Sequence, residues 1–489
     1  TTSGGTALAG TAGRPAGALT LASADTLTAT TLTASGSNGN GADQPGGAGG
    51  TLSITSTGGH VRVGTISAIG GNALAGNANG GNGGSVSLDA GGATPTITHQ
   101  TVTTTGGNRI GSGTAGTGGD ISVADASLLS AATTIAAGGG SAGAGTGGHV
   151  TFGHTVDSSG SNRTLAVNTN GITTFTGAVG ETFALTSLAT DAPGSVRVGG
   201  HVTTTGAQTY NDPLTLLAHS TMTGTTPTFG STLTGGGFDL TLNFSGTTVI
   251  NGAAFTGINQ FVSGNEGTTS LTGAFSTTGA QTFGDAVTLA GNTTLTSSGN
   301  QAITFNSTVN GARALAVNTT GTTTFGGSVG TTTALTSLTT DPGGTTALNG
   351  GAVTTSGNQT YNDAVTMNQL TTATSTGGAI TFAEHATNTL AGAGLTVDAP
   401  TLSLTSGKTV ATTGNGPIRF LTNSFNPNGA NIDAGTGTFT LSPTTLTNTI
   451  EFGDVNTARV TTVYYGSLFG SLTAGSFTIG RATHRGNIF

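Results

Sequence analysis

The stretch RTLAVNTNGITTFTGAVGETFALTSL at residues 163–188 returns almost unchanged as RALAVNTTGTTTFGGSVGTTTALTSL at residues 313–338. Downstream, VTTTGAQTYNDPLTL at 202–216 recurs as VTTSGNQTYNDAVTM at 353–367, with a partial copy, FSTTGAQTFGDAVTL, at 275–289. Repetition of this kind is typical of solenoids, in which each repeat packs only on its neighbours. The sequence therefore predicts a stack of coils.

Apolar residues alternate with Thr or Ser through these repeats, as in LAV at 165–167 and TTF at 173–175. Alternation with a period of two indicates short strands that bury every second side chain. No helix start signal precedes a run with a helical period, so we expect essentially no α-helix. Residues at equivalent positions, such as Phe175 and Phe325, should occupy equivalent inward places in a narrow core.

Residues 1–149 contain a different recurring motif, in which Gly-Gly is followed by a polar residue and then by an apolar one. This motif occurs at residues 49–52, 83–86, 118–121 and 147–150. Each motif opens a short alternating run that leads into a Gly-rich tract, which indicates one long coil per motif. For the most Gly-rich tracts, 36–50 and 70–84, the sequence leaves open whether the loop is packed on its neighbours or mobile.

The composition argues against a compact globule, because Gly occupies 88 of the 489 positions and charged residues make up 6%. A low net charge of −8 and abundant β-branched residues argue against disorder. Cys is absent, so there is no disulfide framework. No stretch approaches ~18 consecutive apolar residues and the basic residues are not clustered, so neither membrane insertion nor nucleic-acid binding is expected.

The predicted fold is all-β: a parallel β-helix, or β-solenoid, that forms an elongated rod of roughly 20 coils. We expect Gly-rich coils with long loops in residues 1–149, regular repeats in 150–416 and divergent coils in 417–489. Neither end of the sequence contains an evident cap, and an uncapped solenoid end offers an open strand edge. Head-to-tail self-association into filaments is therefore expected.

The run LAVNTNGITTFTGAVG at 165–180, followed by QTYND at 208–212, resembles the β-strand repeats of very large bacterial exoproteins of the filamentous-haemagglutinin and autotransporter-passenger type. The close resemblance covers residues 150–367. It implies a right-handed parallel β-helix, export across the outer membrane and a role as adhesin, surface fibre or biofilm-matrix component. Such repeats carry no fixed ligand, so the resemblance implies no binding residues.

Two motifs are candidates for chemistry. Residues 139–143 match G-x-S-x-G, the nucleophile elbow, but at this Gly content a chance match is expected and no strand-to-helix turn follows it. His60, His149 and His201 share the setting Gly-Gly-His-Val, and a row of His residues can bind a metal or sense pH. Thr, Ser and Asp fill the same slot elsewhere, which favours an outward, permissive position.

Asp212, Asp285 and Asp363 recur in the corners YNDP, FGDA and YNDA and are candidates for Ca²⁺ binding. One carboxylate per corner is few for an ion that takes 6–8 oxygen ligands. Side chains that bond the backbone of their own turn explain the corners better. Whether any of the three residues binds Ca²⁺ stays open.

The sequence thus predicts no catalytic, cofactor-binding or metal residues, and a non-enzymatic protein. We expect a secreted structural β-solenoid in an extracellular bacterial fibre, surface layer or adhesin, whose partners are further copies of itself and cell-surface glycans or other matrix components. The alternative is a carbohydrate-binding or carbohydrate-active β-helix of the polysaccharide lyase or hydrolase kind. An enzyme of that kind needs clustered carboxylates, whereas the Glu residues are scattered, at Glu181, Glu266, Glu384 and Glu451.

Overall fold

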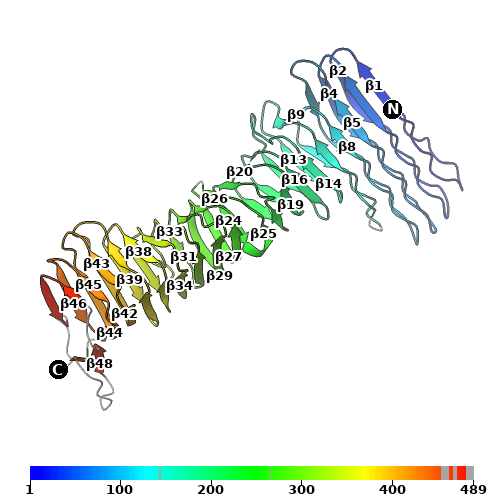
Figure 1. Cartoon of the computed structure of the whole chain (residues 1–489). Coiled ribbons are helices and arrows are strands. Elements are labelled where there is room, and N and C mark those ends of the chain that lie inside the picture. Colours follow the sequence, from blue (N-terminus) through cyan, green and yellow to red (C-terminus); the bar gives the residue numbers. More distant parts are fainter. Residues whose placement is uncertain (143–144, 265, 446, 453–461, 466–470, 481–489) are drawn as a thin grey trace. The chain divides into compact units, whose positions relative to one another are not determined.

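The computed structural model describes residues 1–142, 145–264, 266–445, 447–452, 462–465 and 471–480. The chain divides into two compact units, unit 1 (Thr1–Thr248) and unit 2 (Val249–Phe489). Each unit is a stack of short parallel strands (Figure 1). The helix in the described part is a single 3-10 turn, η1 (Gly252–Ala254), and no helix there is long and apolar enough to cross a membrane. The predicted all-β parallel solenoid is confirmed.

Unit 1 is built from three faces. The first face stacks β1 (Leu19–Ser23), β3 (Leu52–Ser56), β5 (Val86–Asp89), β8 (Ile121–Val123), β11 (Val150–Phe152), β14 (Ile172–Phe175), β16 (Ser195–Val198), β19 (Leu214–Leu216) and β22 (Leu233–Thr234). The second stacks β2 (Leu27–Thr33), β4 (Val61–Ser67), β7 (Val102–Thr103), β10 (Thr133–Ala136), β13 (Thr164–Asn168), β15 (Ser187–Thr190), β18 (Gln208–Tyr210) and β21 (Pro227–Phe229). The third contains β6 (Thr96–His99), β9 (Ala126–Leu129), β12 (Val156–Ser158), β17 (Val202–Thr203), β20 (Ser220–Gly224) and β23 (Leu240–Phe244).

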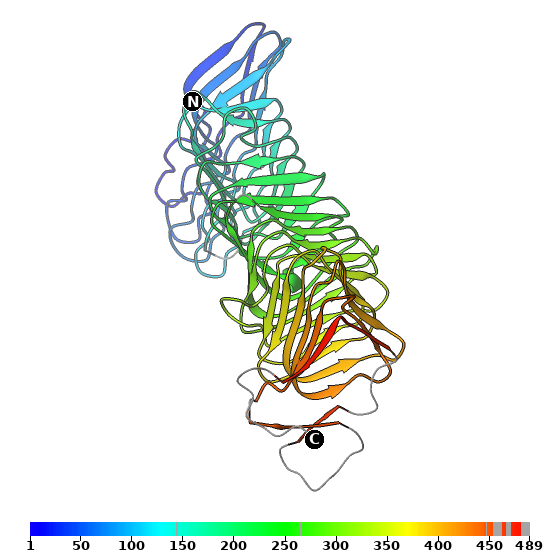
Figure 2. The same ribbon diagram turned by 90° about the vertical axis from the view of Figure 1, so that its left-hand side faces the viewer.

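Unit 2 repeats this plan, and its stacked strands run from green to orange in Figure 2. Its first face stacks β26 (Phe261–Gly264), β28 (Gln281–Phe283), β30 (Ile303–Phe305), β33 (Thr322–Phe325), β35 (Thr345–Leu348), β38 (Ala364–Met367), β41 (Ala386–Asn388), β43 (Thr409–Thr412), β45 (Asn431–Asp433) and β49 (Ser471–Thr473). Its second stacks β27 (Thr268–Thr277), β29 (Ala286–Ser297), β32 (Ala314–Asn318), β34 (Ser337–Thr340), β37 (Gln359–Tyr361), β40 (Ala379–Phe382), β42 (Leu395–Leu404), β44 (Ile418–Asn426), β46 (Thr438–Ser442) and β50 (Ser476–Ile479). The remaining strands are β24 (Thr247–Asn251), β25 (Phe255–Thr256), β31 (Val309–Asn310), β36 (Ala352–Thr355), β39 (Thr371–Ser375), β47 (Thr449–Phe452) and β48 (Thr462–Tyr465).

The structure forms about 13 turns, fewer than the roughly 20 coils expected, although the class of fold is the one predicted. Leu52 pairs with Val86 and Val86 with Ile121, at offsets of 34 and 35 residues, as the Gly-Gly motifs predict. In unit 2 the coils are shorter, since Tyr361 pairs with Phe382 at an offset of 21. The divergent coils expected after residue 416 continue the stack as β44 to β46, whereas Phe489 lies outside the described residues.

A long strand that forks creates the third face. The first half of β4 pairs with β6, whereas its second half pairs with β7. In unit 2, β29 forks in the same way into β31 and β32, and the branches β39 and β40 rejoin on β42. At these forks a coil gains or loses a corner while the strands on either side stay paired.

Aromatic side chains stack in register inside both units. The rings of Phe152 and Phe175 lie 5.2 Å apart and nearly parallel, and the rings of Phe283, Phe305 and Phe325 follow one another at 5.1 Å. Each stacked pair belongs to residues paired by the backbone. Because parallel strands repeat at about 4.8 Å, the backbone places the rings at a spacing suited to aromatic packing. Phe175 and Phe325 are both buried, as the repeat predicted.

The Gly-rich tracts of unit 1 form an ordered lattice beside the strands, visible as the long runs next to β5 and β8 in Figure 1. One series of backbone bonds zigzags through it, from Gly140 to Gly116, Gly107, Gly81, Gly71, Gly47 and Ser37, with N···O distances of 2.8–2.9 Å. Gly50, Gly84 and Gly119, each three positions further along, donate to the carbonyl oxygens of Ala34, Ala68 and Thr104 at 2.7–2.8 Å. A period of three is that of an extended polyproline-II chain, whose backbone groups are free to bond neighbouring chains.

Close approach explains why Gly is required in this lattice. A Cβ atom built on Gly81 would overlap the carbonyl oxygen of Gly47, and one on Gly107 would overlap that of Gly71. Asn side chains complete the bonding along the outer rows, since Oδ1 of Asn72 accepts the N–H of Asn108 at 2.7 Å. The tracts 36–50 and 70–84, whose state the sequence left open, are packed loops.

A buried glutamine recurs in three repeats and forms hydrogen bonds inside the core. The Gln359 amide donates to the carbonyl oxygen of Thr374 at 2.7 Å, and its Oε1 accepts the hydroxyl of Tyr361 at 2.9 Å. Gln208 and Tyr210 repeat this arrangement in unit 1. In the middle copy, Phe283 replaces the tyrosine, and Oε1 of Gln281 is left without a hydrogen-bond partner among the described residues.

Gly-to-Ala substitutions within the Gly lattice should show whether Gly is required there because a Cβ atom would clash, and not only because Gly makes the chain flexible. Gly140→Ala pushes a methyl group into the carbonyl oxygen of Gly107, so it should lower the free energy of unfolding by about 2–3 kcal/mol. Gly138→Ala is the matched control, because its nearest neighbour would lie 4.0 Å away, and its effect should stay within about 0.5–1 kcal/mol. Equilibrium denaturation measures both. Equal losses from the two variants would contradict a packed lattice.

Restoring the missing hydroxyl should stabilise the middle glutamine. Phe283→Tyr supplies a donor to the orphaned Oε1 of Gln281, and we expect a gain of about 1 kcal/mol in unfolding free energy. The reverse change, Tyr361→Phe, removes the donor from Gln359 and should cost about 1–2 kcal/mol. Denaturant titrations of the two variants check the sign. A loss of stability in Phe283→Tyr would show that the ring cannot place its hydroxyl as Tyr361 does.

Candidate functional site

Each of the three predicted histidines forms a hydrogen bond to the next coil through Nδ1. Nδ1 of His149 accepts the N–H of Ile172, and Nδ1 of His201 accepts that of Thr221, each at 3.0 Å. Nδ1 of His60 lies 2.8 Å from the Thr96 hydroxyl. His149 and His201 are exposed, as an outward position requires, and the slot is not restricted to His, since Asp120 occupies it too.

Other side chains make the same bond at this position. Oδ1 of Asp120 accepts the N–H of His149 at 2.7 Å, and Nδ1 of His385 accepts that of Thr409 at 3.1 Å. His219 does likewise, and its Nδ1 lies 2.9 Å from Oδ2 of Asp239. His219 and His385 were missed, although both directly precede an alternating run. In the described part of the chain, no three His, Asp or Glu residues come together as a metal centre.

The G-x-S-x-G match belongs to the Gly lattice. The hydroxyl of Ser141 donates to Oδ1 of Asn108 at 2.9 Å, and Gly140 is one link of the zigzag. Gly143 lies outside the described residues. The hydroxyl is thus engaged in coil-to-coil bonding, which gives no support to a nucleophile elbow.

A buried Ser–His pair escaped the sequence analysis. His99 and Ser127 are completely buried, with Nε2 of His99 2.6 Å from the Ser127 hydroxyl and Nδ1 3.0 Å from the carbonyl oxygen of Gln100. Burial lowers the pKa of His99, so the ring is neutral and Nδ1–H donates to the carbonyl. Nε2 then accepts the hydroxyl hydrogen, as in a catalytic dyad. Neither side chain reaches solvent, so the pair holds the fork between β6 and β7.

The predicted aspartate corner at Asp363 is hydrogen-bonded to the preceding coil. Oδ1 of Asp363 accepts the N–H of Gly344 at 3.2 Å, and Oδ2 accepts the hydroxyl of Thr346 at 3.1 Å. Beside it, the amide of Asn362 donates to the carbonyl oxygen of Thr340 at 2.7 Å. The expectation that these side chains bond the backbone of their own turn was therefore wrong for Asp363. The hydrogen-bond partners of these side chains depend on the register between one coil and the next, which the sequence of a single turn does not show.

Asp212 occupies the equivalent corner of unit 1 but has lost these donors. Val196 takes the place of Thr346 in the repeat, and Oδ1 of Asp212 has no hydrogen-bond partner among the described residues. The side chain is nevertheless 2% exposed. Oδ2 of Asp285, in the middle copy, is buried and without a partner in the described structure too. The three carboxylates lie in separate corners, and none is part of a group of three potential metal ligands among the described residues.

Burial raises the pKa of Asp212 to about 6, with a further contribution from the charge of Asp191 and a partial offset by the Thr190 hydroxyl. Burial also raises the pKa of Asp285 and of Asp363. A raised pKa means that the neutral acid fits the corner better than the carboxylate does. In all three corners, desolvation by burial is the largest cause of the raised pKa.

Glu384, one of the four Glu residues, is engaged within the stack of coils. Oε2 of Glu384 lies 2.7 Å from Nζ of Lys408 in a half-exposed ion pair, which explains both residues as a link between coils. The side chain of Glu451 lies outside the described residues.

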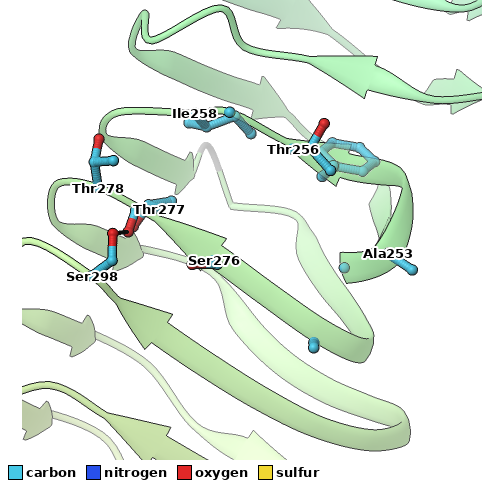
Figure 3. A pocket seen from close by; sticks show the side chains of 11 residues that line it. Ala253, Thr256, Ile258, Ser276, Thr277, Thr278 and Ser298 are labelled. Carbon is cyan, nitrogen blue, oxygen red and sulfur yellow. Dashed lines mark hydrogen bonds between the residues drawn. The ribbon is translucent and has the colours of Figure 1, made fainter.

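A shallow hollow lies on unit 2 beside η1 (Figure 3). Its volume is about 310 Å³, and Thr256, Ser276, Thr278 and Ser298 contribute hydroxyl groups to its lining. Ser298 is already engaged, since its Oγ donates to the carbonyl oxygen of Thr277 at 3.1 Å. The lining contains no charged residue, so the hollow offers hydrogen bonds without acid–base chemistry.

Comparison with models of protein families, with curated proteins and with solved structures finds no match to this chain. Its function is therefore inferred from the geometry.

The Asp212 corner should make stability depend on pH. Its pKa is higher in the folded chain than the unfolded value of 3.8, so its contribution is full below that value and is lost as the pH rises through about 6. We expect unfolding free energy to fall by about 1–2 kcal/mol over this window. Denaturant titration across the pH range should show that Asp212→Asn removes this part of the dependence, whereas the exposed control Asp25→Asn does not. An unchanged profile in Asp212→Asn would contradict the assignment.

Proposed function

We propose that the chain is a structural segment of a secreted bacterial fibre, surface layer or adhesin, with a mechanical and non-enzymatic role. The observation that carries the proposal is how the polar side chains are used. Asn, Asp, His, Ser and Thr side chains bond the coil above or below, as His149, Asn72 and Asp363 illustrate. Side chains used in this way resist separation of the coils.

The resemblance of residues 150–367 to exoproteins of the filamentous-haemagglutinin and autotransporter-passenger type supports the same role. It favours export and display at the cell surface, with glycans or matrix components as partners. The right-handed coil and the extracellular location belong to this proposal.

Assembly through strand edges is part of the proposal. β1 pairs with β3 on one side, and Leu19 directs its N–H to Thr51 of the next coil. Along a parallel strand, the backbone N–H and C=O groups of successive residues point to opposite sides. Those of Thr20 and Ala22 therefore point toward the open side of β1. A further parallel strand, from another copy or from more of the same polypeptide, would fill this edge.

Carbohydrate binding is the alternative, and the hydroxyl-lined hollow of Figure 3 is the feature that favours it. Cleavage of a polysaccharide gains no support from that hollow, because a hydrolase needs two carboxyl groups on either side of the scissile bond.

Blocking the open edge should prevent assembly. Thr20→Pro removes an outward N–H while leaving the bonds between β1 and β3 intact. Electron microscopy of the concentrated chain should show filaments with an axial repeat of about 4.8 Å, and the variant should form few or none. Thr215→Pro, in the interior strand β19, is the contrast, since it should damage the fold itself. Strictly monomeric wild-type chains, or release of reducing ends from polysaccharides, would overturn the proposal.

A further inference from the structure

The corner between β18 and β19 contains an Asp-Pro sequence, Asp212-Pro213. Bonds of this kind are chemically weak, because the tertiary amide nitrogen of proline accepts a proton more readily than an ordinary amide does. In addition, a single new bond from a carboxyl oxygen of the aspartate to its own backbone carbonyl carbon would close a five-membered ring. Most Asp-Pro bonds survive, since water solvates the carboxylate and the chain is flexible.

The corner removes both protections. Asp212 is 2% exposed, and its Oδ1 has no hydrogen-bond partner among the described residues. This oxygen lies against Gly194, where a Cβ atom would be 3.1 Å away. The backbone is held on both sides of the bond: Nδ2 of Asn211 donates to the carbonyl oxygen of Thr190 at 3.0 Å, and the carbonyl of Pro213 accepts the N–H of Val196 at 2.8 Å.

We propose that the folded chain cleaves its own Asp212–Pro213 peptide bond in mild acid, with the Asp212 carboxyl group as both nucleophile and proton source. A fixed intramolecular nucleophile gains reactivity from its orientation, because the entropy of bringing the groups together has already been lost in folding. The site is a covalent processing site within unit 1, and it is independent of the proposed structural role.

The reaction needs only water. A carboxyl oxygen of Asp212 forms a bond to the backbone carbonyl carbon of the same residue, while the carboxyl proton passes to the nitrogen of Pro213. The carbon–nitrogen bond breaks, and Pro213 leaves as a secondary amine. The resulting cyclic anhydride at Asp212 adds one water molecule and opens to a C-terminal aspartic acid. Pro213 is exposed, so solvent reaches the bond.

The protonation state fits this chemistry. Burial, assisted by Asp191, raises the pKa of Asp212 to about 6, so the acid form is populated well above the pH at which an ordinary aspartate is protonated. Asp191 is the titratable group that acts on Asp212, and the neighbouring cation on β16, Arg197, is exposed on the outward side of its strand. Oδ1 accepts no hydrogen bond among the described residues, and the nearby Thr190 hydroxyl offsets only part of the rise in the pKa of the carboxyl group.

Two other corners of the same chain supply controls. Asp363 is equally buried, but both of its oxygens accept hydrogen bonds and Ala364 follows it. Asp341 is followed by Pro342, yet its Oδ1 accepts the N–H of Thr319 at 2.8 Å. Asp212 alone of these three combines burial, a free oxygen and a following proline.

The test incubates the full chain at about pH 5, below the pKa of Asp212, and analyses it by denaturing mass spectrometry. We expect fragments ending at Asp212 and beginning at Pro213. Cleavage there should be at least about tenfold faster than in the same chain unfolded in urea, and than at Asp341–Pro342 in the same sample. Equal rates in folded and unfolded chains, or no cleavage of the folded chain, would overturn the proposal.

Two variants test the geometry. Val196→Thr gives Asp212 the hydroxyl donor that Thr346 gives Asp363, and it should slow cleavage about tenfold. Pro213→Ala reproduces the Asp363 sequence and should abolish it, whereas Asp341→Asn should leave it unchanged. Circular dichroism confirms that each variant is folded. A rate unaffected by Val196→Thr would show that the free oxygen is not the nucleophile.

Discussion

The backbone hydrogen bond between one coil and the next is the constraint on which the whole structure depends. It sets the spacing of about 4.8 Å and places every residue above its equivalent, so that like side chains meet. Phenylalanines such as Phe283 and Phe305 then stack, and glutamines such as Gln359 bond the coil above. A short repeat is enough to specify such a core, because residues that pack well in one coil also pack well at the equivalent positions of the next coil.

The Gly lattice of unit 1 applies the same constraint without side chains. Where the strands end, the chain continues as extended runs whose backbone groups bond in two directions. The absence of a Cβ lets Gly47, Gly81 and Gly116 approach within backbone contact distance of their neighbours. Unit 1 therefore has a core of a second kind, in which dense hydrogen bonding replaces apolar burial.

The sequence predicted whatever depends on a single coil. Alternation placed Phe175 and Phe325 inside, and the Gly-Gly motifs gave the coil lengths of unit 1. It failed where the outcome depends on two coils at once. Asp212 and Asp363 share the local sequence Tyr-Asn-Asp, yet they differ because Val196 or Thr346 lies in the coil beneath. The pairing of His99 with Ser127, 28 residues away, likewise requires the register of β6 on β9.

The side-chain ladders have a direction. In most of them the acceptor belongs to the earlier coil and the N–H donor to the later one, as from Asn38 to Asn72, from Asn72 to Asn108 and from His385 to Thr409. A finished coil thus presents ready acceptors to the coil that follows it, whereas the opposite side offers fewer. Such a stack is a polar template, and we expect ordering to advance toward the carboxyl terminus, the order in which a chain emerges during synthesis.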